Sequence, residues 1–112
     1  MDQSYKGKKV VIIGLGNYEK GSGVSALRYF YSQKAKIVAT DLKTKDQLAP
    51  QLKRLSGLRG IKYVLGKHDM RDILTADLIV KNPGVNNNSP YIVAARKKKI
   101  PIVSDISIFL QN

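Results

Sequence analysis

The fold is decided by the run Lys9-Val10-Val11-Ile12-Ile13-Gly14-Leu15-Gly16. Four β-branched residues in succession are typical of a strand that is buried on both faces of a parallel sheet. The glycines at positions 14 and 16 predict a tight turn directly after that strand. Such a turn lets backbone N–H groups approach a phosphate, and the N-terminus of the next helix adds partial positive charge. This run therefore predicts the start of a Rossmann-like domain with an anion-binding turn.

The same alternation of apolar runs and helical patterns continues along the chain. Further strands are expected at 36–40, 61–65, 77–81 and 100–103, and helices at 23–33, 46–55, 70–74 and 91–98. Ser89 and Pro90 suit the N-cap and first position of the fourth helix. A last helix is expected from Ser104 and Asp105 to Phe109. The pattern predicts an α/β fold, a Rossmann-like five-stranded parallel sheet flanked by helices, in a single domain over residues 1–112.

The glycine turn departs from the usual dinucleotide-binding fingerprint. That fingerprint has a third glycine at a fixed spacing, and Glu19 occupies this place. The segment instead runs on to Gly21 and Gly23. It still predicts a phosphate-binding turn but argues mildly against a standard NAD site. The simpler interpretation is a tight turn whose glycines serve only the packing of helix against strand.

Other polar residues follow the later strands at the same edge of the predicted sheet. Asp41 ends the second strand, where an acid in a Rossmann unit accepts hydrogen bonds from a ribose or a base. It could instead cap the next helix. Lys43 is near enough to reach a phosphate or to cover a base. Asn82-Pro83-Gly84 is a turn whose glycine permits close approach of a ligand.

Several kinds of site are excluded by the composition. The sequence has no cysteine, which rules out disulfides and thiolate chemistry. Its single histidine, His68, makes a zinc site implausible and is interpreted as a solvated loop residue. A P-loop is absent, so this chain is not expected to use ATP by itself. The polar N-terminus is unlike a signal peptide and no apolar run approaches the ~20 residues of a membrane span, so a cytoplasmic protein without a membrane partner is expected.

The net charge is +12, from 20 Lys and Arg against 8 Asp and Glu. Such an excess attracts polyanions and anionic ligands. It is equally explained by a basic proteome, or by a fragment whose acidic remainder is missing. The basic residues are spread along the chain, and the densest cluster, residues 96–99, lacks aromatic neighbours and suits the C-terminal end of a helix. Nucleic acid is therefore not expected as a partner.

Taken in order, these segments resemble the N-terminal domain of UDP-N-acetylmuramoyl-L-alanine:D-glutamate ligases, the MurD-type Mur ligase family. The resemblance rests on five stretches that cover essentially the whole chain: residues 7–16, residues 23–26 with Phe30, Asp41, residues 76–85 followed by Ser89-Pro90, and residues 100–109. Each motif is common by itself, and their order along the chain is what makes the set specific.

The resemblance implies a domain that binds the UDP part of UDP-N-acetylmuramoyl-L-alanine within an ATP-dependent D-glutamate-adding amide ligase of peptidoglycan biosynthesis. ATP and Mg²⁺ belong to a second domain of that family, and the incoming amino acid to a third. Both domains are expected to be missing from this sequence, so the chain alone is expected to be an inactive monomer without catalytic residues, metal or cofactor.

Carried over by position, the residues implied to bind UDP lie after the first, second and fourth strands. They are Gly14, Gly16, Asn17, Tyr18, Gly21, Ser22, Asp41, Leu42, Lys43, Asn82, Pro83 and Gly84. Two departures from the family affect this set. About four residues are inserted between Asn17 and Ser22, and Lys43 stands where an arginine is common, although lysine lacks the planar bidentate contact of arginine.

Two other functions remain open at the level of sequence. The first alternative is an NAD(H)-binding Rossmann module of a dehydrogenase or sensor, against which Glu19 argues. The second is a basic nucleic-acid-binding module, which only the charge of +12 suggests and which would bind in a strongly salt-dependent way.

Overall fold

The computed structural model describes residues 5–16 and 22–104. Its centre is a five-stranded sheet in the order β3-β2-β1-β4-β5, in which every neighbouring pair is parallel. The strands are β1 (Lys9–Ile13), β2 (Lys36–Asp41), β3 (Lys62–Leu65), β4 (Leu78–Lys81) and β5 (Ile102–Ser104). The predicted Rossmann-like sheet is thereby confirmed.

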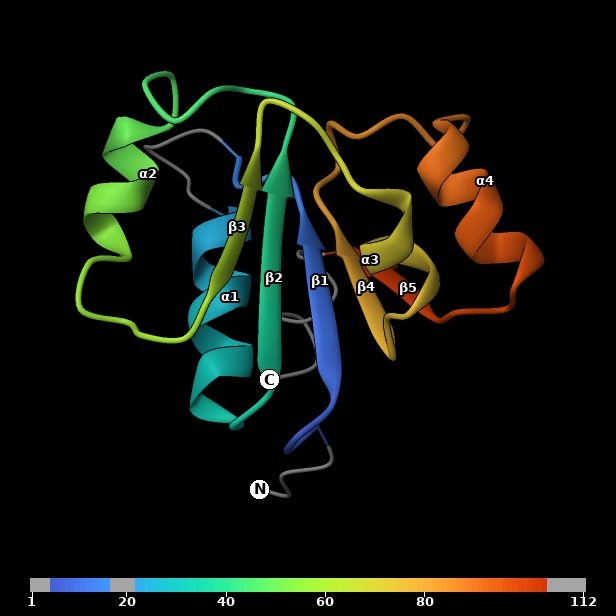
Figure 1. The fold of residues 1–112 in the computed structure, drawn as a ribbon, viewed down its shortest axis with the longest axis horizontal. Helices are drawn as coiled ribbons and strands as arrows, with labels where there is room; N and C mark the ends of the chain where they lie inside the picture. Colours follow the sequence, from blue (N-terminus) through green and yellow to red (C-terminus); the bar gives the residue numbers. More distant parts are fainter. Residues whose placement is uncertain (1–4, 17–21, 105–112) are drawn as a thin grey trace.

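Helices connect the strands and cover both faces of the sheet (Figure 1). They are α1 (Ser22–Ser32), α2 (Ala49–Arg54), α3 (Met70–Leu74) and α4 (Pro90–Lys97). In Figure 1, α1 lies behind the sheet, α3 lies in front of β4, and α4 lies to the right of the strands. Strands that alternate with crossover helices must run in the same direction, which is why the sheet is parallel.

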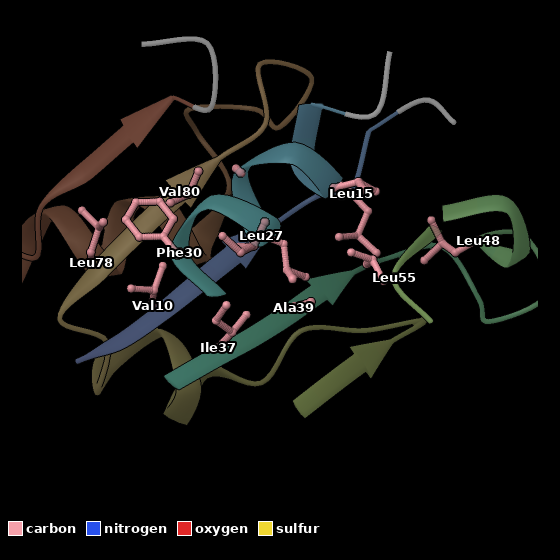
Figure 2. Close-up of a cluster of buried hydrophobic side chains, with 13 residues drawn as sticks. Val10, Leu15, Leu27, Phe30, Ile37, Ala39, Leu48, Leu55, Leu78 and Val80 are labelled. Carbon is pink, nitrogen blue, oxygen red and sulfur yellow. The ribbon is translucent and has the colours of Figure 1, made fainter. Parts of the chain in front are cut away.

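The two faces of β1 carry two separate cores. Val10 and Ile12 pack with Leu27 and Phe30 of α1, a cluster that Figure 2 shows between helix and sheet. Val11 and Ile13 belong to a second cluster, which α3 and α4 complete. Residues 10–13 are at most 1% exposed, and burying an aliphatic side chain contributes about 1.5–3 kcal/mol. An alanine at position 12 would therefore destabilise the fold from its centre.

The strand order places a topological switch beside β1. The chain moves outward from β1 to β2 and β3, and then returns to place β4 on the other side of β1. The connections after β1 and β4 consequently leave the carboxyl edge in opposite directions, and ligands bind in the crevice that opens at such a point. Gly14, directly after β1, lies at this crevice.

Most predicted bounds agree with the observed ones to within about two residues. The second helix was expected from residue 46 but starts at Ala49, because Pro50 fits only the first turn of a helix. The predicted N-cap of α4 is confirmed, since the Ser89 hydroxyl accepts a hydrogen bond from Tyr91 N at 3.3 Å. The helix expected between Ser104 and Phe109 lies outside the described residues. Within the described part of the chain, no helix has the length and apolarity to span a bilayer.

Candidate nucleotide-binding site

The turn after β1 adopts backbone conformations that favour glycine. Gly14 has φ +89° and Gly16 has φ +79°, a region that costs other residues energy. A Cβ on Gly14 would also lie 2.9 Å from Asn82 Cβ, so the turn after β1 and the turn after β4 approach each other at this glycine. The Gly14 N–H donates to Thr40 O at 2.8 Å and is therefore occupied.

The first turn of α1 packs directly on the glycine turn through Gly23. A Cβ at this position would lie 2.3 Å from Gly14 O and 2.6 Å from Leu15 Cα. Close packing of helix on strand is the role of the third glycine in the dinucleotide fingerprint. Gly23 performs it from a place four residues beyond Glu19. Gly23 thus supplies the helix-on-strand packing from a different position, and the mild argument from Glu19 against a standard NAD site stays a prediction.

Asp41 shapes the site through backbone hydrogen bonds. Its Oδ2 accepts from Leu15 N at 3.0 Å, and its Oδ1 accepts from Lys43 N at 2.9 Å. The carboxylate therefore ties the end of β2 to the glycine turn, and the Leu15 amide is not available to a phosphate. The Gly16 N–H, by contrast, makes no hydrogen bond with any residue in the described ranges.

Gln51 supports the turn from the opposite side, and the sequence analysis did not identify it. Its Nε2 donates to Gly16 O at 2.6 Å, and Gln51 is a buried residue of α2. Its Oε1 has no partner among the described residues. The sequence does contain a signal for this residue. Gln51 lies three positions after Leu48 and four before Leu55, which places a polar side chain on the buried face of a helix.

The turn after β4 completes the opposite wall of the crevice. Asn82 N donates to Ile13 O at 3.0 Å, which continues the pairing of β4 with β1. The Asn82 side chain then accepts from Gly84 N at 2.9 Å and closes the Asn82-Pro83-Gly84 turn. Asn82 is thereby fixed next to Gly14.

Two cavities meet at this edge of the sheet and share Gly14, Asp41, Gly84 and Val85. The first, of about 300 Å³, is lined by the shared residues with Gly16, Lys43 and Asn82. The second, of about 450 Å³, adds Ile13, Leu42, His68, Asn86, Ser89, Pro90 and Tyr91. One crevice thus has a polar end formed by glycine backbone and a lysine, and an end with mostly apolar and aromatic walls.

Most of the sequence-predicted site residues that the structure describes are brought together here. Gly14, Gly16, Asp41, Lys43, Asn82 and Gly84 line the polar end, and Leu42 lines the apolar end. Pro83 lies in the turn between them without lining either cavity. Ser22 begins α1. Asn17, Tyr18 and Gly21 lie outside the described residues.

His68 is the main functional candidate that the sequence analysis misjudged. It is half-buried rather than fully solvated, because its ring contacts Thr40 at the end of β2 and Tyr91 of α4. Its Nδ1 lies 2.6 Å from Thr40 Oγ1, and its ring meets Tyr91 edge-on with centroids 4.9 Å apart. Burial lowers the pKa of His68, and the negative charge of Asp41 partly opposes this. The imidazole is therefore neutral near pH 7.

The described residues offer no obvious metal centre. Among residues 5–16 and 22–104, no three His, Cys, Asp or Glu side chains come together as a metal site would require. The hydrogen-bond donors at the crevice are instead a backbone amide and a lysine, which suit a phosphorylated organic ligand.

Residues 8–104 match the family described as Mur ligase MurD-like, N-terminal domain. The chain belongs to this family. It is 42% identical over 106 residues to the UDP-N-acetylmuramoylalanine–D-glutamate ligase of Borreliella burgdorferi (strain ZS7), covering 94% of this chain and 22% of that protein. It is 37% identical over 107 residues to the enzyme of the same name from Treponema pallidum (strain Nichols), covering 95% and 20%.

A solved structure agrees with the fold of this MurD-like domain. UDP-N-acetylmuramate-alanine ligase MurC from Thermotoga maritima superposes with a TM-score of 0.70 at 22% identity, over 93% of this chain and 22% of that one. The resemblance seen in the sequence is confirmed. The chain spans about a fifth of the length of the curated relatives it matches.

Proposed function

We propose that this MurD-like domain binds the UDP part of UDP-N-acetylmuramoyl-L-alanine for a ligase that adds D-glutamate to it. The observation that supports the proposal is that the two cavities adjoin, because they share the lining residues Gly14, Asp41, Gly84 and Val85. A nucleoside diphosphate has a flat, weakly polar end and a strongly anionic end, and the crevice offers a matching volume for each. The names of the relatives are consistent with such a ligand.

The diphosphate would lie at the polar end of the crevice. The Gly16 N–H, which has no partner in residues 5–16 and 22–104, and the first turn of α1 supply donors and positive dipole there. Lys43, which is exposed and makes no hydrogen bond through its side chain within the described residues, supplies the mobile charge. The nucleoside would lie against Asp41, Leu42 and the Asn82-Pro83-Gly84 turn.

The contribution of the domain to the reaction would be the orientation of the substrate. ATP and Mg²⁺ would bind another domain of the whole ligase, because this sequence has no P-loop. We propose that residues 1–112 form one monomeric domain of a cytoplasmic enzyme that supplies cell-wall precursors, and hence cell shape and division. The isolated domain would be inactive.

The proposal is tested by titrating the ¹⁵N-labelled chain with UDP. We expect the amide resonances of Gly14, Gly16 and Asp41 to shift in a saturable way. Lys43→Gln should weaken binding roughly 5- to 10-fold, as loss of one charge-assisted contact does. Lys45→Gln, an exposed lysine outside the crevice, is the matched control. No shift at millimolar UDP would overturn the proposal.

An NADH titration addresses the alternative function. Gly23 gives the turn the packing that dinucleotide sites use. Tighter binding of NADH than of UDP would favour a dinucleotide module. Under our proposal UDP binds more tightly.

A further inference from the structure

The hydrogen bonds on either side of the Gly16 N–H restrain this donor of the glycine turn. Among residues 14–16, the Gly16 N–H is the amide that no described residue uses. On one side of it, Asp41 Oδ2 accepts from Leu15 N at 3.0 Å. On the other side, Gln51 Nε2 donates to Gly16 O at 2.6 Å. Because a peptide unit is planar, anchoring the backbone on both sides of it restricts the direction in which the Gly16 N–H points.

Gln51 also sets the direction of the Gly16 carbonyl group. Gly16 has φ +79°, and without a side chain it leaves the neighbouring peptide units free to rotate. A carbonyl oxygen carries partial negative charge, and one that faced the polar end of the crevice would repel an anion there. Gln51 belongs to α2 and binds this oxygen from there, whereas Gly16 itself lines the smaller cavity. The Gly16 carbonyl is thereby occupied by a donor of the protein.

The burial of Gln51 indicates a role other than stability. Gln51 is 4% exposed, and its Oε1 has no hydrogen-bond partner among the described residues. A buried acceptor left unpaired costs at least as much free energy as one neutral hydrogen bond contributes. Its neighbours on the same helical face, Leu48 and Leu55, are buried and apolar. An apolar side chain of similar length at position 51 would therefore fold at least as well, and would lack only the bond to Gly16 O.

We propose that Gln51 is a positioning residue for the diphosphate, which turns the Gly16 carbonyl away from the polar end of the crevice and the Gly16 N–H towards it. The inference rests on the proposed function, because it requires a nucleoside diphosphate in the crevice. Gln51 lines neither cavity, so it acts through the backbone of Gly16 and not by contact with the ligand. Its effect is therefore specific to the phosphate groups and absent for the nucleoside.

The test compares UDP with uridine, which lacks the phosphate groups, by ¹⁵N amide shifts at pH 7.5. Gln51→Met keeps the length of the side chain but removes the donor and the unpaired acceptor. We expect this variant to bind UDP about 10-fold more weakly and uridine equally well, while its midpoint of urea unfolding stays the same or rises. Gln33→Met, the same change directly after α1 and outside both cavities, should alter the affinity for neither ligand.

Gln51→Glu gives a reversible form of the same test. At pH 8 its carboxylate cannot donate to Gly16 O, and UDP should bind about 10-fold or more weakly than to the wild-type chain. A protonated carboxyl group regains a donor, so this deficit should shrink as the pH falls towards 5. Asp41, Lys43 and His68, the ionisable groups of the crevice, are present in both chains, so their effects cancel in the ratio of the two affinities.

The inference is overturned if Gln51→Met binds UDP like the wild-type chain, or if it loses UDP and uridine to the same extent. A deficit of Gln51→Glu that stays constant with pH would also overturn it, and this measurement decides if Gln51→Met does not fold. Either failure is confined to the variants and leaves the proposed function standing. No binding of UDP by the wild-type chain would overturn both.

Discussion

The two edges of the sheet use their charged side chains in opposite ways. At the amino edge, Lys9 and Lys62 each place Nζ 3.1 Å from Oδ1 of Asp72, whose side chain is only 8% exposed. Asp77 accepts from Lys9 N at 2.8 Å at the same edge. At the carboxyl edge, Asp41 contacts no lysine ammonium in the described residues and accepts two backbone N–H groups instead.

The difference shows which edge is available to a ligand. At the amino edge, Lys9 and Lys62 share the single negative charge of Asp72, and these contacts contribute to stability. At the carboxyl edge the acid fixes the shape of the backbone, which leaves the Gly16 N–H, the Lys43 ammonium and His68 Nε2 without partners among the described residues. Ligand binding should therefore depend on the carboxyl edge, and the amino edge should affect only folding.

The largest effect is expected from Gly23→Ala, at the carboxyl edge. The added Cβ would lie 2.3 Å from Gly14 O, a backbone atom that cannot move without displacing the turn. We expect a loss of about 3 kcal/mol in the free energy of unfolding, even though alanine favours helix by up to ~1 kcal/mol. Urea unfolding measures it, with Ser25→Ala in the same helix as control. An unchanged midpoint of urea unfolding in Gly23→Ala would show that α1 does not pack on the glycine turn in this way.

A smaller effect is expected from Asp72→Asn, at the amino edge. The substitution removes the charge that two lysines contact and leaves a buried amide, at a cost of about 1.5–2 kcal/mol. Asp46→Asn, at an exposed acid with no side-chain hydrogen bond in the described part of the chain, should change stability by less than ~0.5 kcal/mol. UDP affinity should be unchanged in both. An Asp72→Asn variant that folds but binds UDP poorly would refute the separation of the two edges.

The fold could be predicted because its determinants are local in sequence. The apolar run before Gly14 and the similar runs after it specify strands directly, and alternation with helices specifies a parallel sheet. The start of α2 was placed too early because the leucine spacing begins at Leu48, before the position where Pro50 permits the helix. Periodicity identifies the buried face of a helix but not where the helix starts.

The site could be predicted only in part, because its details are made by residues distant in sequence. Gly14, Asp41 and Asn82 were found because each follows a strand. The hydrogen bond from Leu15 N to the Asp41 carboxylate depends on the register of β1 with β2. The packing role of Gly23 and the burial of His68 depend on how α1 and α4 approach the sheet. No spacing in the sequence encodes these contacts.

The smallest effect is expected from the titration of His68, and it sharpens the comparison at the carboxyl edge. Burial lowers the pKa of this imidazole below its ordinary 6.5, while the negative charge of Asp41 opposes the shift. The other groups in contact with the ring are the Thr40 hydroxyl and the Tyr91 ring. Between the folded-state pKa and 6.5, the unfolded chain therefore binds more protons than the folded chain, and stability rises with pH.

The neutral form of His68 gives the chain its full free energy of unfolding above about pH 6.5. That free energy decreases as the pH falls through the folded-state pKa of His68. We expect the free energy of unfolding of the wild-type chain to drop further between pH 7.5 and pH 5 than that of His68→Phe, which has nothing to titrate at this position. All other acids and bases are common to the two chains, so the difference between the two slopes belongs to His68. Because the ring is only half-buried, solvent screening keeps this difference small. Parallel slopes would mean that the imidazole is solvated after all, and the carboxyl edge would then hold no half-buried titrating group to set against the ion pairs of the amino edge.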